Sequence, residues 1–166
     1  HSPSRRQRQM CIRDSAHPGN IQDMHFMLQK EMAERLSAQP GSKAWGRLSV
    51  MTQITVHAEY LFDVPPGSFH PPPKVDSLII RLTPRAPAAL PVPRKSLDRV
   101  LRLAFAGRRK RLSNALKPLQ LDWAALAVDP GKRADDVTIE EFLAIAQQSQ
   151  AMLSSTDING DAGVAH

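Results

Sequence analysis

The sequence predicts an α/β fold in which a small helix-bearing sheet is followed by a separate all-helical domain. Two short apolar runs, Met24–Leu28 and Leu78–Leu82, have the length and composition of buried strands. Prolines then stand at positions 84, 87, 91 and 93, a density typical of a linker between domains. Beyond this linker, apolar residues recur at helical spacing. We therefore place a domain boundary at residues 84–95.

The first domain is expected to alternate strands and helices. The strand at residues 24–28 runs into a helix over residues 30–38, which ends before Pro40-Gly41. The ambiguous segment 48–64 is interpreted as a helix that gives way to a strand from about His57. Together with the strand at 78–82, these elements make up the domain at residues 16–83.

Residues 69–77, Phe-His-Pro-Pro-Pro-Lys-Val-Asp-Ser, are the most informative segment of the chain. Three consecutive prolines fix φ and donate no backbone N–H, so the segment is neither helix nor central strand. We expect a stiff, extended loop with Phe69 at its mouth, suited to stacking on a flat ligand such as a nucleic-acid base. The alternative is a proline-stiffened turn whose Phe69 belongs to the core. Lys74 either contacts a phosphate or pairs with Asp76.

The helical domain, residues 96–148, is expected to begin with a long amphipathic helix. Ser96 is the expected N-cap, and the helix runs to about Leu116, where Pro118 follows. Apolar side chains fall on one arc, and a basic stripe without an acidic residue falls on another, roughly 100° wide. The basic stripe consists of Lys95, Arg99, Arg102, Arg109, Lys110 and Lys117. It is either a phosphate-binding surface or a solvated helix face.

Two further features belong to the helical domain. Arg108 falls on the apolar arc, so its stem is expected to pack there and its guanidinium to pair with an acid. Thr138-Ile139-Glu140-Glu141 has the pattern of a capping box at the start of a last helix. The polar residues 149–166 are expected to form a disordered tail.

The first fifteen residues are expected to be a non-native or disordered leader. They lack apolar periodicity, and Met10–Ser15 is the translation of a DNA sequence similar to a transposon-end adapter used in sequencing libraries. The alternative is a genuine basic tail. Arg5, Arg6, Arg8 and Arg13 against Asp14 account for +3 of the net charge of +6, and the single cysteine, Cys11, also lies there.

Composition excludes several classes of protein. The chain of 166 residues is 42% hydrophobic, but no run approaches the roughly eighteen apolar residues of a membrane span. Neither membrane insertion nor secretion is supported, and we expect a cytoplasmic protein. The six histidines show no metal-binding spacing, so no metal site is expected.

Four segments resemble the ribosomal RNA adenine dimethyltransferases, in the order of that family. The Phe69–Ser77 loop with the strand after it is similar to the family's signature loop. Asp23–Leu36 resembles its fifth sheet strand and following helix, and Ser42–Val50 with Gln53 resembles the next segment, where the family usually has Tyr at the Trp45 position. Phe105–Leu116 resembles the basic helix of the family's C-terminal domain. The similarity runs from about Ala16 to about Gln148.

The resemblance implies a fold, an activity and a partner. The fold would be the C-terminal part of a Rossmann-like methyltransferase sheet followed by a small helical domain. The intact enzyme would use S-adenosylmethionine to place two methyl groups on N6 of adjacent adenosines in small-subunit rRNA. Phe69 would stack on the target base, while Lys74 and the basic stripe would bind RNA. The expected partner is the immature small ribosomal subunit, bound by a monomer.

The parts of that family that hold the methyl donor have no counterpart here. The family uses a Gly-rich turn after the first strand, an acidic residue after the second, and an Asn-Leu-Pro-Tyr segment near the target amino group. The eight glycines of this chain are scattered, and no G-x-G occurs. We therefore expect this chain to have no cofactor-binding residues, to bind no S-adenosylmethionine and to be inactive alone.

Other functions remain as alternatives. The chain could act as a non-catalytic RNA- or ribosome-binding module through its helical domain alone. A DNA-binding helical regulator would explain the basic stripe, but it has no use for the proline loop. Within the resembled family, Gln29–Glu31 and Arg108–Lys110 favour the small-subunit housekeeping type over the large-subunit resistance type.

Overall fold

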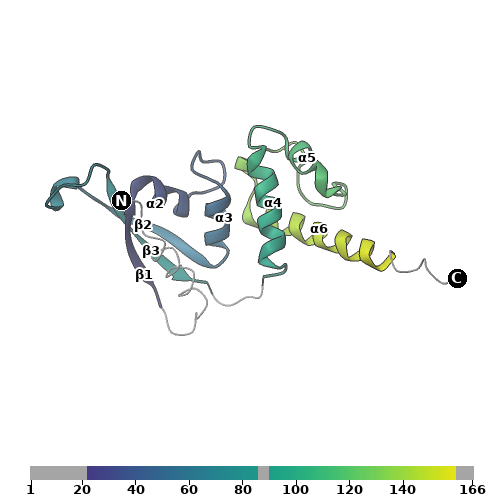
Figure 1. The fold of residues 1–166 in the computed structure, drawn as a ribbon, viewed down its shortest axis with the longest axis horizontal. Coiled ribbons are helices and arrows are strands. Elements are labelled where there is room, and N and C mark those ends of the chain that lie inside the picture. Colours follow the sequence, from purple (N-terminus) through teal and green to yellow (C-terminus); the bar gives the residue numbers. More distant parts are fainter. Residues whose placement is uncertain (1–21, 86–89, 160–166) are drawn as a thin grey trace. The chain divides into compact units, whose positions relative to one another are not determined.

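The computed structural model describes residues 22–85 and 90–159, which form two compact units (Figure 1). Among these residues, the sheet unit comprises 22–39 and 48–85, and the helical unit comprises 40–47 and 90–159. The helical unit thus includes a segment that sequence analysis assigned to the first domain. The expectations for the leader 1–15, for part of the linker and for the end of the tail fall on residues outside the described ranges.

The sheet unit contains three strands, β1 (Met24–Gln29), β2 (Val56–Val64) and β3 (Ser77–Pro84). Their order is β1-β3-β2, and β3 is antiparallel to both neighbours. The register pairs Met27 and Phe62 with Ile79, and a bulge shifts β2 between Tyr60 and Phe62. The strands expected around residues 24–28, from about 57, and at 78–82 are confirmed.

Two helices complete the sheet unit, α2 (Lys30–Ser37) and α3, which begins at Arg47 and ends at Gln53. Ala33 of α2 is fully buried and belongs to the same core as Ile80 and the other inward-facing strand residues. The side-chain amide of Gln53 donates to the carbonyls of Leu36, at 2.9 Å, and Ala38, at 2.7 Å. These bonds satisfy carbonyl groups that the end of α2 leaves without helical partners.

The other face of the sheet carries exposed apolar side chains. Met27 is 50% exposed and Phe62 is 56% exposed, and both pair with Ile79 of β3. The burial of β3 alternates along the strand, with Leu78, Ile80 and Leu82 buried. The sheet therefore packs one face against α2 and leaves the opposite face uncovered by the described residues.

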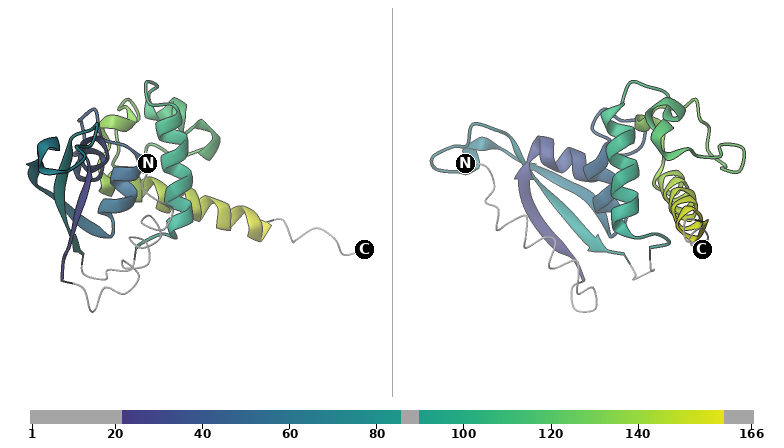
Figure 2. Two further views of the ribbon diagram at one scale, coloured as in Figure 1. Left: turned by 60° about the vertical axis from the view of Figure 1, so that its left-hand side comes forward. Right: turned by 45° about the vertical axis from the view of Figure 1, so that its right-hand side comes forward.

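The helical unit is built from α4 (Arg94–Ala106), α5 (Leu112–Ala115) and α6 (Ile139–Asn159), with single 3₁₀ turns η2 (Lys117–Leu119) and η3 (Ala134–Asp136). Helices α4 and α6 pack against each other, and the left view of Figure 2 shows them crossing. The rings of Phe105 and Phe142 lie 5.7 Å apart at this contact. Fully buried side chains of the unit include Trp45, Leu97, Leu101, Leu112, Val137, Phe142 and Ile145.

Three expectations about the helical unit are wrong. Helix α4 begins at Arg94 with Pro93 as N-cap, so Ser96 lies within its first turn. It ends at Ala106, and Gly107 and a turn separate it from α5, so residues 96–116 are not one helix. Helix α6 continues to Asn159, so its last turns replace the first part of the expected disordered tail. Residues 149–159 contain neither proline nor glycine to stop the helix.

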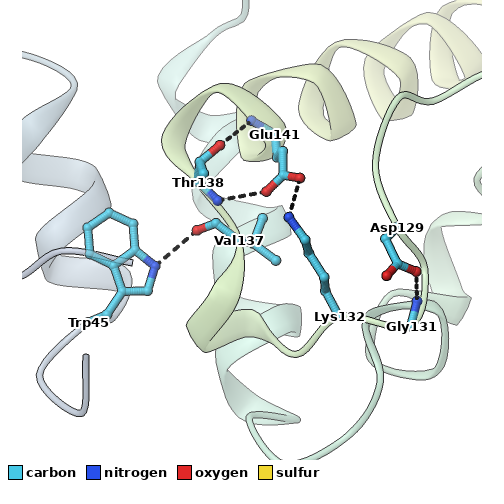
Figure 3. Close-up of polar contacts among 7 residues, drawn as sticks. All are labelled: Trp45, Asp129, Gly131, Lys132, Val137, Thr138 and Glu141. Atoms are coloured by element: carbon cyan, nitrogen blue, oxygen red, sulfur yellow. Dashed lines mark hydrogen bonds and ion pairs between the residues drawn. The ribbon is translucent and has the colours of Figure 1, made fainter. Parts of the chain in front are cut away.

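The capping box at the start of α6 is confirmed (Figure 3). The Thr138 N–H donates to Glu141 Oε2 at 2.9 Å, and the Glu141 N–H donates to Thr138 Oγ1 at 3.2 Å. Lys132 Nζ lies 2.7 Å from the other Glu141 oxygen, with only 18% of the Glu141 side chain exposed. One carboxylate thus caps the helix and neutralises a lysine.

We expect Glu141→Ala to lower the free energy of unfolding by about 1–2 kcal/mol, because it removes one half of the capping box and leaves Lys132 unpaired. Glu141→Gln should cost about half as much, because its amide oxygen still accepts from Thr138. Urea titration followed by far-ultraviolet circular dichroism measures both. The matched control is Glu140→Ala on the same turn, an exposed acid with no ion pair among the described residues. Equal losses for Glu140→Ala and Glu141→Ala would contradict the capping role.

Candidate functional site

The loop between β2 and β3 projects from the end of the sheet (Figure 1). It opens with Pro65 and the 3₁₀ turn η1 (Pro66–Ser68), and the three prolines from Pro71 onward carry it back to β3. No residue from 69 to 76 is helical or in a strand, as the prolines predicted.

The loop returns to the sheet at a fixed point. Ser77, the first residue of β3, pairs with Gln29 at the end of β1 and with Val64 at the end of β2. The Lys30 N–H donates to the Asp76 carbonyl at 2.9 Å, joining the start of α2 to the base of the loop. The loop therefore lies at the edge where β1 and β2 end, which is where ligand sites of α/β sheets usually form.

The two predicted site residues of this loop are accessible. Phe69 follows η1 with extended backbone, its N–H donating to the Pro66 carbonyl at 3.3 Å, and its side chain is half-buried. Phe69 is absent from the buried core of the sheet unit. Lys74 is exposed, and among the described residues it makes no ion pair, including none with Asp76. The alternatives of a core phenylalanine and of a Lys74–Asp76 pair are therefore wrong.

The basic stripe does not form one continuous helical face. Lys95, Arg99 and Arg102 lie on α4, but Arg109 and Lys110 lie in the turn after it, and Lys117 begins η2. All six side chains are exposed. Apart from Arg102, they make no ion pair among the described residues. The stripe therefore consists of five cations without an ion pair among the described residues and one paired arginine, and its residues lie on α4, in the turn after α4 and on η2.

The pairing of Arg102 involves an acid, Asp98, that lies beside the stripe on α4. Arg102 Nε lies 2.9 Å from Asp98 Oδ2, and Arg47 lies 2.7 Å from Asp98 Oδ1. Asp98 is 18% exposed, and this burial raises its pKa, but the two guanidinium groups outweigh burial and hold the pKa below the ordinary 3.8. Arg102 is thus engaged in a structural cluster, which weakens its assignment to RNA.

The Asp98 cluster should make the stability of the helical unit sensitive to acid. Because the folded-state pKa is depressed, the cluster's contribution is present above the ordinary carboxyl pKa and is lost as the pH falls through the folded value. Asp98→Asn should lower stability at neutral pH and flatten the acid limb of a plot of stability against pH. Urea midpoints from neutral to strongly acidic pH test this. Asp136→Asn, at an exposed acid without an ion pair among the described residues, is the control and should leave the acid limb unchanged.

Arg108 behaves as its position on the apolar arc predicted. Its Nε lies 2.6 Å from Asp135 Oδ1, and its Nη2 donates to the carbonyls of Lys43, at 2.7 Å, and Trp45, at 3.0 Å. The Gly41 N–H also donates to the Asp135 carbonyl at 2.6 Å. Arg108 and Asp135 therefore fasten segment 40–47 to the rest of the helical unit.

Two polar residues near the end of α4 were not among the predicted site residues. Arg111 and Asn114 are exposed beside Lys110 and Lys117, and Asn114 lines a surface hollow with them. The uninterrupted basic run at residues 108–111 could have indicated Arg111. On the single long helix that was expected, however, Arg111 falls outside the arc of the basic stripe. Within the described ranges, no cluster of three or more metal-ligating side chains occurs, and no helix is both long and apolar enough to span a membrane.

Sequence comparison relates the chain to known proteins over most of its length. The family model for ribosomal RNA adenine dimethylase matches residues 10–151, a range that includes residues 10–15 of the expected leader. The chain is 52% identical over 138 residues to ribosomal RNA small subunit methyltransferase A of Pseudomonas aeruginosa, covering 80% of this chain and 50% of that protein. It is 48% identical to the protein of that name from Ralstonia nicotianae, with coverages of 80% and 49%. The chain spans about half the length of these relatives.

Solved structures share the fold. A dimethyladenosine transferase from Plasmodium falciparum superimposes with a TM-score of 0.69 at 23% identity, covering 86% of this chain and 63% of that one. The 23S rRNA methyltransferase ErmE gives a TM-score of 0.58 at 24% identity, with coverages of 86% and 61%. The predicted fold class, part of a Rossmann-like sheet followed by helices, is confirmed.

Proposed function

Because this chain belongs to the ribosomal RNA adenine dimethylase family, we propose that it is the carboxy-terminal part of an enzyme that dimethylates N6 of adjacent adenosines in small-subunit rRNA. The methyl donor of the intact enzyme is S-adenosylmethionine. The partner is the immature small ribosomal subunit in the cytoplasm, and the enzyme acts as a monomer. The uncovered face of the sheet, with Met27 and Phe62, receives the part of the family domain that this chain lacks.

The observation that carries the proposal is the placement of Phe69. The Phe69 ring lies outside the buried core. The loop that carries it is anchored at the sheet edge by the hydrogen bond from the Lys30 N–H to the Asp76 carbonyl and by the pairing of Ser77. An accessible aromatic ring on a stiff, anchored loop is suited to hold one base that has left its stack.

Alignment is what such a base needs. Adenine N6 is a poor nucleophile because its lone pair is delocalised into the ring. A ring stacked on the adenine fixes the base plane and so limits the directions in which N6 can meet an electrophile. A stack of this kind is worth on the order of 1–3 kcal/mol. Lys74 stands in the same loop and contacts a phosphate near the base, which its exposure and its lack of an ion pair among the described residues support.

The described residues do not fit the methyl donor. Helix α2 follows β1 directly through Gln29, so this strand end offers no glycine-rich turn for a nucleotide-like ligand. Of the described glycines, only Gly41 has positive φ, and it lies in the segment held by the helical unit. We expect isothermal titration of the chain with S-adenosylmethionine to show no binding, whereas micromolar binding would contradict the assignment of the donor site to another part of the enzyme.

A non-catalytic RNA-binding module is the second candidate function. The free cations Lys95, Arg99, Arg109, Lys110 and Lys117 all lie in the helical unit, so RNA affinity does not require the donor site. The two candidates make the same prediction for this surface. They differ at Phe69, which matters only if a base is modified.

The free cations should give RNA binding a steep salt dependence. Replacing Arg109 and Lys110 together by alanine should weaken binding to small-subunit rRNA and flatten the plot of log K against log[salt] by about 0.7–0.9 for each phosphate that is no longer neutralised. Filter binding at several salt concentrations measures the slope. The matched control replaces Lys43 and Arg133, an exposed lysine and arginine of the same unit without side-chain ion pairs among the described residues. An unaltered slope for the Arg109 and Lys110 variant would remove these residues from the interface.

A further inference from the structure

A surface hollow of about 490 Å³ lies where α4 ends and α5 and η2 begin. Its apolar wall includes Leu103 and Ala106 from the last turns of α4 and Pro118 from η2. Its polar side chains are Lys110, Asn114 and Lys117. The volume is within the range of about 300–1,000 Å³ typical of sites for small organic groups. The hollow lies entirely within the helical unit.

Gly107 gives the hollow its shape. A Cβ atom at this position would lie 3.1 Å from the Ala115 Cβ and 3.5 Å from the Lys110 Cδ. The missing side chain therefore lets Ala115 of α5 approach the end of α4 closely. The same residue ends α4, so the break that divides the basic stripe also creates the hollow.

The positive charge around the hollow favours the binding of an anion. Between Asp98 and Asp122 the sequence carries seven arginine and lysine side chains and no aspartate or glutamate. Asp98 and Asp135 engage two of the seven, Arg102 and Arg108. Lys110 and Lys117 are exposed and make no ion pair among the described residues.

A bare phosphate would use the lysines but not the apolar wall. We propose that the hollow binds one unpaired nucleotide of RNA, with its base against the Leu103 and Ala106 wall and its phosphates at Lys110 and Lys117. The amide of Asn114 can donate to and accept from a base edge. A double helix keeps its bases stacked inside, so only an unpaired nucleotide can bring a base face to the wall. This proposal rests on RNA being the partner, and it adds a preference for unpaired strand.

The test compares two RNAs on the full 166-residue chain. Fluorescence anisotropy measures the affinity for an unstructured oligoribonucleotide and for a hairpin duplex with the same number of phosphates. Ala106→Leu fills the apolar wall without changing charge, at an exposed position. We expect it to weaken binding of the unpaired RNA about tenfold and binding of the duplex less than twofold. The control Ala127→Leu, at an exposed alanine outside the hollow, should change neither affinity.

The charge variants separate this proposal from the proposed function. Lys110→Gln and Lys117→Gln should weaken both RNAs, because duplex phosphates also reach exposed lysines. If they do so while Ala106→Leu leaves unpaired RNA unaffected, the surface binds RNA but the hollow holds no base. If the chain binds neither RNA, the proposed function fails as well. Competition by polyglutamate equal to that of the oligoribonucleotide would also overturn the nucleotide assignment.

A second variant checks the base contact independently. Asn114→Ala, at an exposed side chain of the hollow, should weaken binding of unpaired RNA severalfold and spare the duplex. Far-ultraviolet circular dichroism confirms the fold of each variant. Equal losses for both RNAs would assign Asn114 to phosphate contact and contradict the proposal.

Discussion

Trp45→Ala is expected to lower the free energy of unfolding of the helical unit by about 3–5 kcal/mol. The Trp45 side chain is fully buried, and its Nε1–H donates to the Val137 carbonyl at 3.1 Å (Figure 3). The substitution removes the largest buried side chain of the unit and leaves a cavity. It also leaves the carbonyl of a fully buried residue without its donor.

Urea titration followed by far-ultraviolet circular dichroism measures this loss without relying on the tryptophan signal. Trp45→Phe should cost less, because the ring is largely retained and only the N–H donor and part of the volume disappear. Trp123→Ala is the matched control, at a partly exposed tryptophan of the same unit. A loss below about 1 kcal/mol for Trp45→Ala would show that segment 40–47 contributes little to the unit.

The importance of segment 40–47 could not be predicted from the sequence. Local patterns locate strands and helices well, as with β1 and α2, because periodicity and the Pro40-Gly41 stop are contained in a few consecutive residues. Membership in a domain depends on partners far along the chain. Arg108 reaches the carbonyls of Lys43 and Trp45 across more than sixty intervening positions. The sequence predicted an acidic partner for Arg108, but it did not predict that the same side chain fastens this segment.

The break between α4 and α5 has a similar cause. A lone glycine inside a helical pattern costs only about 1 kcal/mol, so the sequence favours continuing through Gly107. The structure supplies competing partners after it. The Leu112 N–H donates to the Lys132 carbonyl at 2.7 Å, and the Ser113 N–H donates to the Pro130 carbonyl at 3.1 Å. These backbone N–H groups, which a continuous helix would have bonded internally, are instead bonded to a turn that is distant in sequence. The local pattern therefore predicted which residues belong to the basic stripe but not how they are arranged.

The loop at residues 69–76 is the opposite case, because its constraint is local. Three consecutive prolines exclude a helix and a central strand, so the loop could be predicted without knowledge of the fold, whereas the sequence left open whether Phe69 lies in the core. The sequence could not show the anchoring of the loop base by the Lys30–Asp76 bond. That anchor is what makes a stacking ring useful, because a base is aligned only if its support is fixed.

Phe69→Ala should therefore lower methyl-transfer turnover by a factor of about 5–150, which corresponds to the 1–3 kcal/mol of one base–aromatic stack. RNA affinity should change little, because we propose that it comes mainly from the cations of the helical unit. Turnover requires a complete enzyme, and a chimera that supplies the amino-terminal half of the Pseudomonas aeruginosa relative provides one. Methyl-transfer rates at saturating RNA, measured beside filter binding, separate the two effects.

Two further variants test whether the ring itself is responsible. Phe69→Tyr keeps an aromatic face in the loop and should retain most of the turnover, whereas Phe69→Leu keeps apolar bulk without a π-face and should resemble Phe69→Ala. Phe62→Ala, at an exposed ring on the uncovered sheet face, tests whether losing any exposed aromatic has the same effect. A Phe62→Ala defect that appears as instability rather than slower chemistry would agree with packing of that face in the intact enzyme. Full turnover by Phe69→Leu would contradict the stacking role, because apolar bulk without a π-face would then be sufficient.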